Sequence, residues 1–304
     1  MCIRDRYNFA PHAGHHVSVG GNVRVLYLSP KQQYTEQLNP IAPPYVEQLV
    51  GAFAVDRWKL SDRFVLEGQL RGDFYSGTEV DWATRLTAFY LLDERRDQNL
   101  RFSFARAFRS PQTALRATTR TSVYHPLLGT YLFNLNQGDD LKNEQTWALE
   151  AGYTTRLRGP WTFRSDAYYQ RFERLIGYRI TGAGPTFYTP ANIGGADSWG
   201  IETELAAQNK IGKLSLWHCY NDFETDAPDQ LIRSYVPAKH KFGCTARLFL
   251  PDRWTLNAIY RYCDVTPIAG ETVLVPVGHS HRFDLAIAKG FSDGRGEILS
   301  LIHI

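Results

Sequence analysis

Hydrophobic and polar residues alternate along most of this chain, most regularly between residues 63 and 75. One set of alternate positions holds Phe64, Leu66, Gly68, Leu70, Gly72 and Phe74, and the other holds Val65, Glu67, Gln69, Arg71 and Asp73. A period of two residues is typical of β-strands, whose successive side chains point to opposite faces of a sheet. The pattern therefore predicts a strand with one apolar face and one charged face.

Twelve stretches of the chain are predicted to be strands. They are residues 16–28, 45–60, 63–75, 81–92, 99–109, 145–157, 161–174, 198–209, 213–223, 238–250, 254–265 and 280–290. Most exceed the five or six residues usual in soluble sheets, and about ten residues are needed for a tilted strand to cross a bilayer. In 213–223 the assignment of faces stays open, because Trp217 and His218 each suit either face.

The connections between these stretches alternate in length. Short ones lie at 61–62, 93–96, 158–160, 210–212 and 251–253, and long ones at 29–44, 110–144, 175–197, 224–237 and 266–279, with 76–80 a short exception on the long side. Outer-membrane barrels have short periplasmic turns and longer external loops. A soluble sandwich has no reason to sort its loops in this way, so the lengths favour a membrane barrel.

The charged positions decide what each face contacts. A charged side chain at mid-bilayer on a lipid-facing position costs about 2–4 kcal/mol, whereas a wet lumen tolerates it. A closed soluble barrel of eight strands fills its interior with apolar side chains instead. We therefore predict an all-β, antiparallel, up-and-down transmembrane β-barrel fragment, as an open curved sheet or a smaller barrel forced shut. Its charged face lines a lumen.

Six Trp residues stand near the ends of predicted strands. Trp58, Trp161 and Trp254 lie beside short turns, and Trp82, Trp147 and Trp199 lie near long connections. Indole rings combine an apolar body with an N–H group and prefer membrane–water interfaces. Any one of them is equally well explained as a packed core residue, but six near strand ends predict two aromatic girdles.

Composition excludes several classes of protein. The formal net charge of +3 is too small for a nucleic-acid argument, and no run approaches the ~20 apolar residues of a membrane helix. Cys219, Cys244 and Cys263 lack the spacing of a zinc cluster.

The string around His12, His15 and His16 suits a borderline metal ion. Without a carboxylate or Cys nearby, we expect only the polar start of a strand there, with no metal and no cofactor.

Five short motifs follow one another between residues 51 and 205. They read "GAFAVDRW" from 51, "LEGQLRGDFY" from 66, "FSFARAFRSP" from 102, "LKNEQTWALEAGY" from 141 and "NIGGADSWGIETEL" from 192. Each motif is weak alone, but in this order they resemble the barrel of TonB-dependent outer-membrane receptors. In the fourth motif, Asn143 replaces the usual Pro.

The resemblance implies a barrel of about 22 strands, of which about twelve lie here, and an N-terminal plug domain that this chain does not show. It implies an outer-membrane location in a Gram-negative bacterium and uptake of a scarce ligand, most commonly a ferric siderophore, with energy delivered through TonB. The implied partners are outer-membrane lipid, the TonB complex through the plug, and the ligand, with no nucleic acid. A passive porin-like channel and a barrel enzyme are the alternatives. No Gly-x-Ser-x-Gly motif accompanies the histidines, so we expect no catalytic residues.

Two groups of residues are predicted to carry the function. Aromatic residues and Arg dominate binding hot spots, so external ligand contacts are expected from Arg109, Tyr124, His125, Tyr131, Phe133 and Tyr188, although ordinary loop packing also explains each one. The lumen is expected to be lined by Glu67, Arg71, Arg101, Glu150, Arg164, Asp166, Glu202 and Glu204.

The two ends of the chain are set apart from this fold. Codons for residues 1–6 can be chosen whose reverse complement encodes the closing Leu-Ser-Leu-Ile-His-Ile. This resembles an adapter of transposon-based sequencing libraries. We therefore expect residues 1–6 and 299–304 to be adapter read-through and 7–298 to be the partial barrel. Sequencing the native locus would refute this if it encoded Met1 and Ile304.

Overall fold

The computed structural model describes residues 2–28, 45–93, 97–112, 124–125, 130–131, 134–135, 140–181, 187–226, 237–269, 274–291 and 296–303. A 15-stranded sheet dominates it. Its long strands are β1 (Cys2–Phe9), β2 (His15–Leu28), β3 (Tyr45–Lys59), β4 (Phe64–Tyr75), β5 (Asp81–Leu91), β6 (Gln98–Arg109), β10 (Glu144–Arg156), β11 (Trp161–Thr181), β12 (Phe187–Gln208), β13 (Gly212–Thr225), β14 (His240–Phe249), β15 (Trp254–Cys263), β18 (Ser280–Phe291) and β19 (Gly296–His303).

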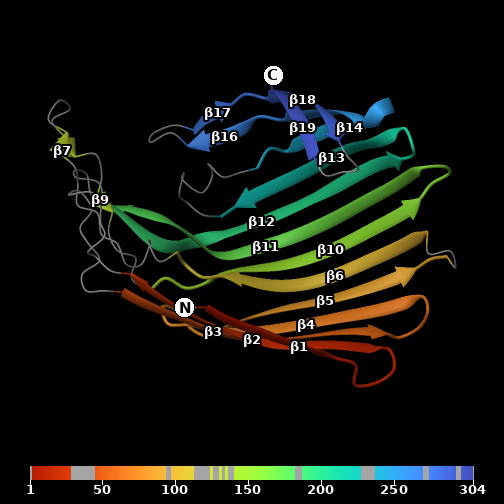
Figure 1. Ribbon diagram of the computed structural model, residues 1–304. Coiled ribbons are helices and arrows are strands. Elements are labelled where there is room, and N and C mark those ends of the chain that lie inside the picture. The colour runs from red at the N-terminus through yellow and green to blue at the C-terminus, as the bar shows by residue number, and fades with distance from the viewer. Residues whose placement is uncertain are drawn as a thin grey trace.

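These strands pair antiparallel in the order in which they follow one another along the chain. The sheet is curved and open, because β1 pairs only with β2 and β19 pairs only with β18 (Figure 1). We call one end the short-turn end, where residues 60–63, 157–160, 209–211 and 250–253 connect neighbouring strands, and the opposite end the long-loop end. The arrangement confirms the predicted all-β, up-and-down sheet.

Small elements at the long-loop end complete the description. The strand β9 (Asn134–Leu135) pairs with β12 in parallel, while β7 (Tyr124–His125) pairs with β8 (Thr130–Tyr131), and β16 (Thr266–Ala269) pairs with β17 (Leu274–Val277). At the opposite, short-turn end, the 3-10 turn η2 (Pro251–Arg253) joins β14 to β15. No helix among the described residues is long and apolar enough to span a membrane.

All twelve predicted stretches form strands, but one predicted loop is wrong. Residues 175–197 were expected to be a long connection, whereas β11 continues to Thr181 and β12 begins at Phe187. The pairing shifts register between Phe172 and Ile176, where Arg174 has a φ of 57°. This bulge interrupts the alternation without ending the strand, because extra residues are absorbed and pairing resumes beyond them. No strand was predicted at either terminus, where the structure has the edge strands β1 and β19.

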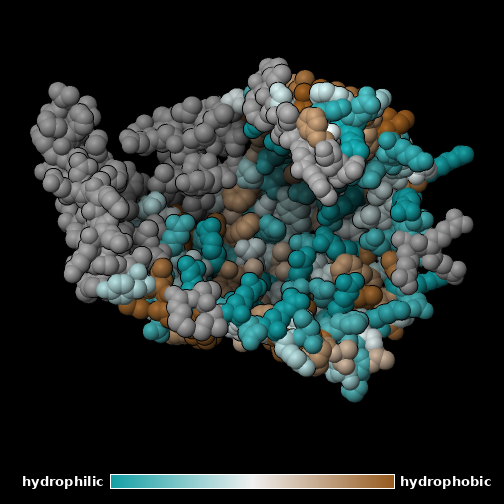
Figure 2. All heavy atoms as spheres, viewed as in Figure 1, coloured by the Kyte–Doolittle hydropathy of each residue, from teal (hydrophilic) through white to brown (hydrophobic). Residues whose placement is uncertain are grey.

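Burial in this sheet is the reverse of that in a soluble protein. The buried side chains include Asp73, Thr87, Ser103 and Asp284, each less than 9% exposed, while Leu70 and Leu149 are 58% and 56% exposed. Polar side chains crowd together over the hollow of the curved sheet, where Figure 2 shows hydrophilic residues. An apolar surface of this extent on a monomer indicates a partner that is itself apolar.

Candidate functional site

The register of the sheet defines an inner face, which carries the charged side chains. Residues directly opposite in neighbouring antiparallel strands lie on the same face. Ser103 lies opposite Glu150, Gly152 opposite Asp166, and Asp166 opposite Glu202. The same reasoning over β4 to β12 brings together on the inner face all eight residues that the sequence suggested for a lumen: Glu67, Arg71, Arg101, Glu150, Arg164, Asp166, Glu202 and Glu204.

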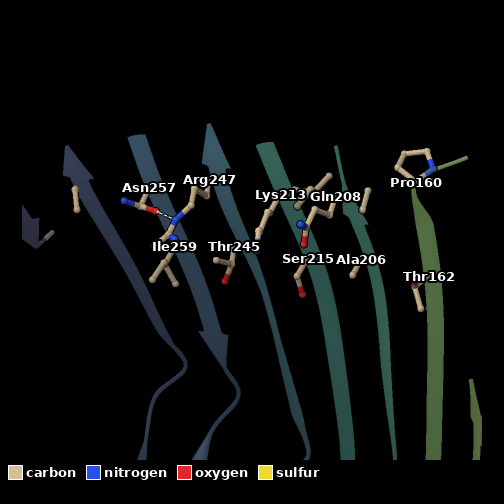
Figure 3. Close-up of a pocket in the computed structure, with 13 residues that line it drawn as sticks. Pro160, Thr162, Ala206, Gln208, Lys213, Ser215, Thr245, Arg247, Asn257 and Ile259 are labelled. Atoms are coloured by element: carbon tan, nitrogen blue, oxygen red, sulfur yellow. Dashed lines mark hydrogen bonds between the residues drawn. The ribbon is translucent and has the colours of Figure 1, made fainter. Parts of the chain in front are cut away.

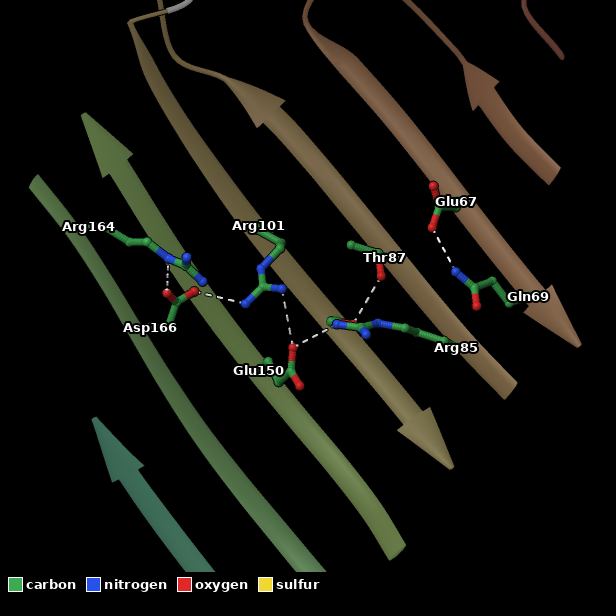
Figure 4. A network of polar contacts seen from close by, with 9 residues as sticks. Glu67, Gln69, Arg85, Thr87, Arg101, Glu150, Arg164 and Asp166 are labelled. Atoms are coloured by element: carbon green, nitrogen blue, oxygen red, sulfur yellow. Dashed lines mark hydrogen bonds and ion pairs between the residues drawn. The ribbon is translucent and has the colours of Figure 1, made fainter. Parts of the chain in front are cut away.

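A chain of ion pairs crosses the inner face from β5 to β11 (Figure 4). Glu150 receives Arg85 at 2.9 Å and Arg101 at 3.5 Å, measured between nitrogen and carboxylate oxygen. Arg101 also reaches Asp166 at 2.8 Å, and Arg164 holds the second oxygen of Asp166 at 2.5 Å. Each carboxylate therefore joins two guanidinium groups, which fixes the side chains of four strands relative to one another.

Hydroxyl and amide groups extend this chain of contacts. The Nε of Arg85 donates to Ser103 at 3.0 Å, and Ser103 lies 3.0 Å from the hydroxyl of Thr87. On β4, the amide of Gln69 donates to Glu67 at 2.8 Å. The polar atoms thus satisfy one another in a crowded surface, as buried polar groups require.

Two further ion pairs lie toward the long-loop end. Arg71 donates to both oxygens of Asp73 at 2.5 Å, and the same guanidinium reaches Asn22 on β2. Arg109 pairs with Glu144, whose second oxygen accepts the backbone N–H of Ile176 at 2.9 Å. The latter contact joins β6, β10 and β11 at the residue where regular pairing resumes after the bulge.

Two glycines make room for these side chains. A Cβ built on Gly152 would lie 2.5 Å from a carboxylate oxygen of Asp166 and 3.2 Å from Arg101. A Cβ on Gly51 would lie 2.1 Å from Asp73. Real Cβ atoms do not approach other atoms so closely, so these positions need glycine to let a charged side chain lie flat over the neighbouring strand.

The structure decides the open assignment in β13. Trp217 lies opposite Glu204 and Gly243, and therefore points to the inner face, while His218 points to the outer face. The inner-face Glu204 accepts a hydrogen bond from the hydroxyl of Ser215 at 2.5 Å. Trp217 is consequently the one Trp that does not belong to the predicted girdles.

The outer face is the apolar face, and it carries the other six Trp residues. Register places Trp58, Trp82, Trp147, Trp161, Trp199 and Trp254 there. At the long-loop end the rings of Trp82 and Trp147 meet at 6.1 Å, nearly perpendicular. At the short-turn end Trp58 stacks on His15 with 5.0 Å between ring centroids.

Sequence reasoning missed the charged groups on this outer face, among them Arg171 and Asp197, which lie 2.5 Å apart, and the two described next. Arg106 is 5% exposed, forms an ion pair with Asp81 at 2.9 Å, and lies 4.2 Å from the ring of Trp82 and 5.5 Å from that of Trp147. Asp56 lies 2.8 Å from His15, which places a carboxylate beside the histidine string where none was expected. The sequence does contain a signal for Arg106, because this charged residue occupies the position between Phe104 and Phe108 on the otherwise apolar face of its strand.

Arg106 and Asp56 lie near an end of their strands, where a paired cation or carboxylate is tolerated at a membrane interface. Lys239, which directly precedes β14, contacts Asp222 of β13 at 2.7 Å, and this hydrogen bond raises the pKa of Lys239. Among the described residues, no group of three His, Cys, Asp or Glu side chains is arranged to hold a metal ion.

The predicted ligand contacts are only partly described. Arg109 is largely exposed at the end of β6 and paired with Glu144. The backbones of Tyr124, His125 and Tyr131 lie in β7 and β8, and that of Tyr188 lies in β12 beside β9. Phe133 lies outside the described residues.

An apolar convex face, a charged concave face and long antiparallel strands define a segment of a membrane β-barrel with a hydrated lumen. The model of the family described as TonB dependent receptor-like, beta-barrel, matches residues 5–292. The chain belongs to this family. Members are outer-membrane transport receptors of Gram-negative bacteria rather than enzymes. A search of curated protein sequences finds no match.

Solved structures similar to this chain include siderophore and iron receptors. The siderophore receptor PirA from Pseudomonas aeruginosa aligns with a TM-score of 0.71 at 16% identity, over 96% of this chain and 51% of PirA. A mutant of the ferric enterobactin receptor PfeA from the same organism, in complex with enterobactin, gives 0.72 at 15%, over 96% and 46%. The iron transporter FrpB from Neisseria meningitidis gives 0.69 at 12%, over 93% and 47%. These values show a shared fold, and the chain spans about half the length of each structure.

Proposed function

We propose that this chain forms part of the barrel of an outer-membrane receptor that takes up a scarce ligand, a ferric siderophore, with energy delivered through TonB. The observation that carries the proposal is the pairing of a charged inner face with an apolar outer face, in a chain of the TonB-dependent receptor family. The siderophore receptors among the similar structures support this substrate class.

The inner-face charges would serve a plug domain and the permeation path. The network around Glu150 and Asp166 is well connected, because each of the two carboxylates contacts two arginines. A plug inside the barrel would bind to this surface through hydrogen bonds. Residues proposed for this role are Glu67, Arg71, Arg101, Glu150, Arg164, Asp166, Glu202 and Glu204.

The long-loop end would face the cell exterior and the short-turn end the periplasm, as in other outer-membrane barrels. The six outer-face Trp residues would then form the two interfacial girdles, with Arg106 held between two of them. Ligand capture is assigned to the long-loop end, where Arg109, Tyr124, His125, Tyr131, Phe133 and Tyr188 are the proposed contacts.

Energised uptake in cells tests the proposal. The gene containing this chain would be expressed in a strain that lacks its own siderophore receptors, and accumulation of ⁵⁵Fe-loaded siderophores would be measured with and without functional TonB. We expect uptake that saturates and is lost without TonB. Uptake that persists without TonB and rises linearly with concentration would instead indicate a passive channel.

A further inference from the structure

A cavity of about 510 Å³ lies at the long-loop end, bordered by the turn at 76–80, the start of β5 and residues 140–143. We call it the rim cavity. Trp82, Arg106 and Gln145 line it from outer-face positions of β5, β6 and β10. None of the eight residues predicted for the lumen contributes to its lining. The rim cavity therefore belongs to the outer flank of the sheet.

The rim cavity differs in this respect from a cavity on the inner face. That inner cavity, of about 630 Å³, lies between β11 and β18 (Figure 3), on the side of the sheet where the proposed plug would lie. The strands that border the rim cavity, β4, β5, β6 and β10, each have both of their neighbours in the sheet. Neither a plug in the lumen nor a further strand would therefore fill it.

Three buried polar side chains line the rim cavity and hold one another in place. Asp81, Arg106 and Asn143 are 6%, 5% and 5% exposed. Arg106 pairs with one carboxylate oxygen of Asp81 at 2.9 Å, and the other oxygen accepts the amide N–H of Asn143 at 3.3 Å. The amide of Gln145 donates to that second oxygen at 3.4 Å. These contacts make a hydrogen-bonded floor.

One atom of this floor lacks a hydrogen-bond partner. The side-chain oxygen Oδ1 of Asn143 is buried and accepts no hydrogen bond from the part of the chain that the structure describes. The amide cannot be turned over to remedy this, because Oδ1 would then meet the carboxylate of Asp81, and two acceptors repel each other. Buried acceptors are normally satisfied, so we expect a donor group inside the rim cavity.

Asn143 is also the residue at which this chain departs from the motif that it resembles. The motif has Pro at this position, and a Pro side chain can neither donate nor accept a hydrogen bond. The unsatisfied acceptor is therefore a property of this chain rather than of the motif.

The exposed side chains around the rim cavity carry charges of both signs. Glu79 and Asp140 are acidic, while Lys142 and Arg174 are basic. Their charges sum to zero, which favours neither an anion nor a cation. Donors and acceptors side by side suit hydroxyl groups, which can both donate and accept. The ring of Trp82, 43% exposed, adds an apolar surface on which the C–H face of a sugar ring can pack.

We propose that the rim cavity binds a saccharide, one of whose hydroxyl groups donates a hydrogen bond to Oδ1 of Asn143. The volume of the cavity falls within the range of roughly 300–1,000 Å³ that is typical of small-molecule sites. A soluble sugar and the headgroup of a membrane glycolipid share the chemistry that this site recognises. The proposal does not rest on the transport function, because the site needs neither the lumen nor the plug.

Saturation-transfer NMR on the intact, full-length protein tests the site. The protein would be kept in a polyoxyethylene detergent, which has no sugar headgroup, and titrated with glucose, galactose, glucosamine and maltose. We expect saturable binding of at least one sugar and a loss of about three- to tenfold in affinity in Asn143→Ala, because one hydrogen bond is removed. No saturable binding, or an unchanged affinity in the variant, would overturn the proposal and leave water as the partner of Asn143.

Asn221→Ala is the matched control. Asn221 is also buried and its Oδ1 also lacks a partner among the described residues, but it lies on β13 and does not line the rim cavity. Its substitution should leave sugar affinity within about twofold of the wild type, because the two sites share no partner. Equal losses in the two variants would contradict the proposal.

A second variant keeps the test independent of folding. Glu79→Ala/Lys142→Ala changes only exposed side chains of the rim cavity and leaves the net charge as it is. We expect sugar binding to weaken by about threefold or more, since two polar contacts are lost. An unchanged affinity in this variant would also overturn the proposal.

Dodecyl maltoside distinguishes the two sources of the saccharide, because it carries the headgroup of maltose on an alkyl chain. Binding tighter than that of maltose, and weakened in Asn143→Ala, would assign the rim cavity to a membrane glycolipid. Equal affinity for the two compounds, again weakened in the variant, would assign it to a soluble sugar. Binding that Asn143→Ala fully retains would be partition into the micelle and would contradict the proposal.

Discussion

Two parts of one continuous sheet carry opposite arrangements of charge. The inner face of β4, β5, β6, β10, β11 and β12, which we call the paired wall, has acids and arginines interleaved. The inner face of β13, β14, β15 and β18, which we call the cationic wall, carries Lys213, Lys241, Arg247, Arg261 and Arg282. In the paired wall each carboxylate of the central network contacts two arginines, and the glycine at position 152 leaves space for them. In the cationic wall cations face each other across neighbouring strands. The alternation of apolar and polar residues therefore does not determine whether the charges of an inner face are paired.

The difference in charge pairing gives the two walls different physical properties. Paired charges have little to offer a passing ligand, because their potentials cancel within a few ångströms and breaking them leaves unmatched charge. Unpaired cations of the same sign create a field that attracts an anion and falls off with salt. We infer that the ion pairs of the paired wall stabilise the sheet, whereas the facing cations of the cationic wall destabilise it.

The largest effect is expected from filling the space that the paired wall leaves open. Gly152→Ala places a methyl group 2.5 Å from Asp166 and 3.2 Å from Arg101, so the ion-pair chain must shift. We expect a loss of about 1–3 kcal/mol in the free energy of unfolding. The measurement is urea unfolding in detergent, followed by the heat-modifiable mobility of the folded barrel in gels.

The control for this substitution is Gly72→Ala on the outer face, where a Cβ would meet no atom within 4 Å. That variant should stay within about 0.5 kcal/mol of the wild type. If the two variants were equally stable, the inner face would be looser than the structure indicates, and the distinction between the two walls would lose its basis.

A smaller loss is expected from removing one carboxylate of the paired wall. Glu150→Gln leaves Arg85 and Arg101 without a shared countercharge. We expect a destabilisation of about 1–2 kcal/mol, moderated because these side chains are partly exposed. Urea midpoints at low and high salt measure it, and the loss should shrink at 1 M salt.

Glu67→Gln provides the comparison within the same wall. Glu67 accepts a hydrogen bond from Gln69 but forms no ion pair among the described residues. Its substitution should change the free energy of unfolding by less than about 0.5 kcal/mol. A Glu67 variant as unstable as the Glu150 variant would show that position in the wall, rather than ion pairing, determines stability.

The sequence was sufficient to predict the strands and both faces where alternation is uninterrupted. Residues 63–75 were assigned correctly because a period of two fixes the face of every side chain once one is known. The same logic failed after Phe172, since a bulge with Arg174 at positive φ changes the phase of the pattern while the strand continues. A single sequence carries no marker that separates such a bulge from the end of a strand.

Contacts within the site were less predictable than its residues. Glu150 and Arg85 are 65 residues apart, and they meet only because β10 pairs with β6 across the elements β7, β8 and β9. Arg106 appears in the sequence as an exception among apolar positions, but its two Trp neighbours and Asp81 come from other strands. The charge difference between the walls was readable in advance, by sorting Lys and Arg by face for each strand.

The smallest effect, and the one of opposite sign, is expected in the cationic wall. Arg247→Gln removes one member of the like-charge pair with Lys213, so the protein should become more stable by about 0.2–1 kcal/mol at low salt. Arg247→Lys keeps the repulsion and should match the wild type. Urea midpoints without ligand measure both variants, and the gain should disappear in 1 M salt because exposed charges are screened.

A loss of stability in Arg247→Gln comparable to that of Glu150→Gln would mean that Arg247 is a structural partner, and the two walls would then be alike. A gain in Arg247→Gln that is absent in Arg247→Lys would show that facing cations destabilise this part of the sheet.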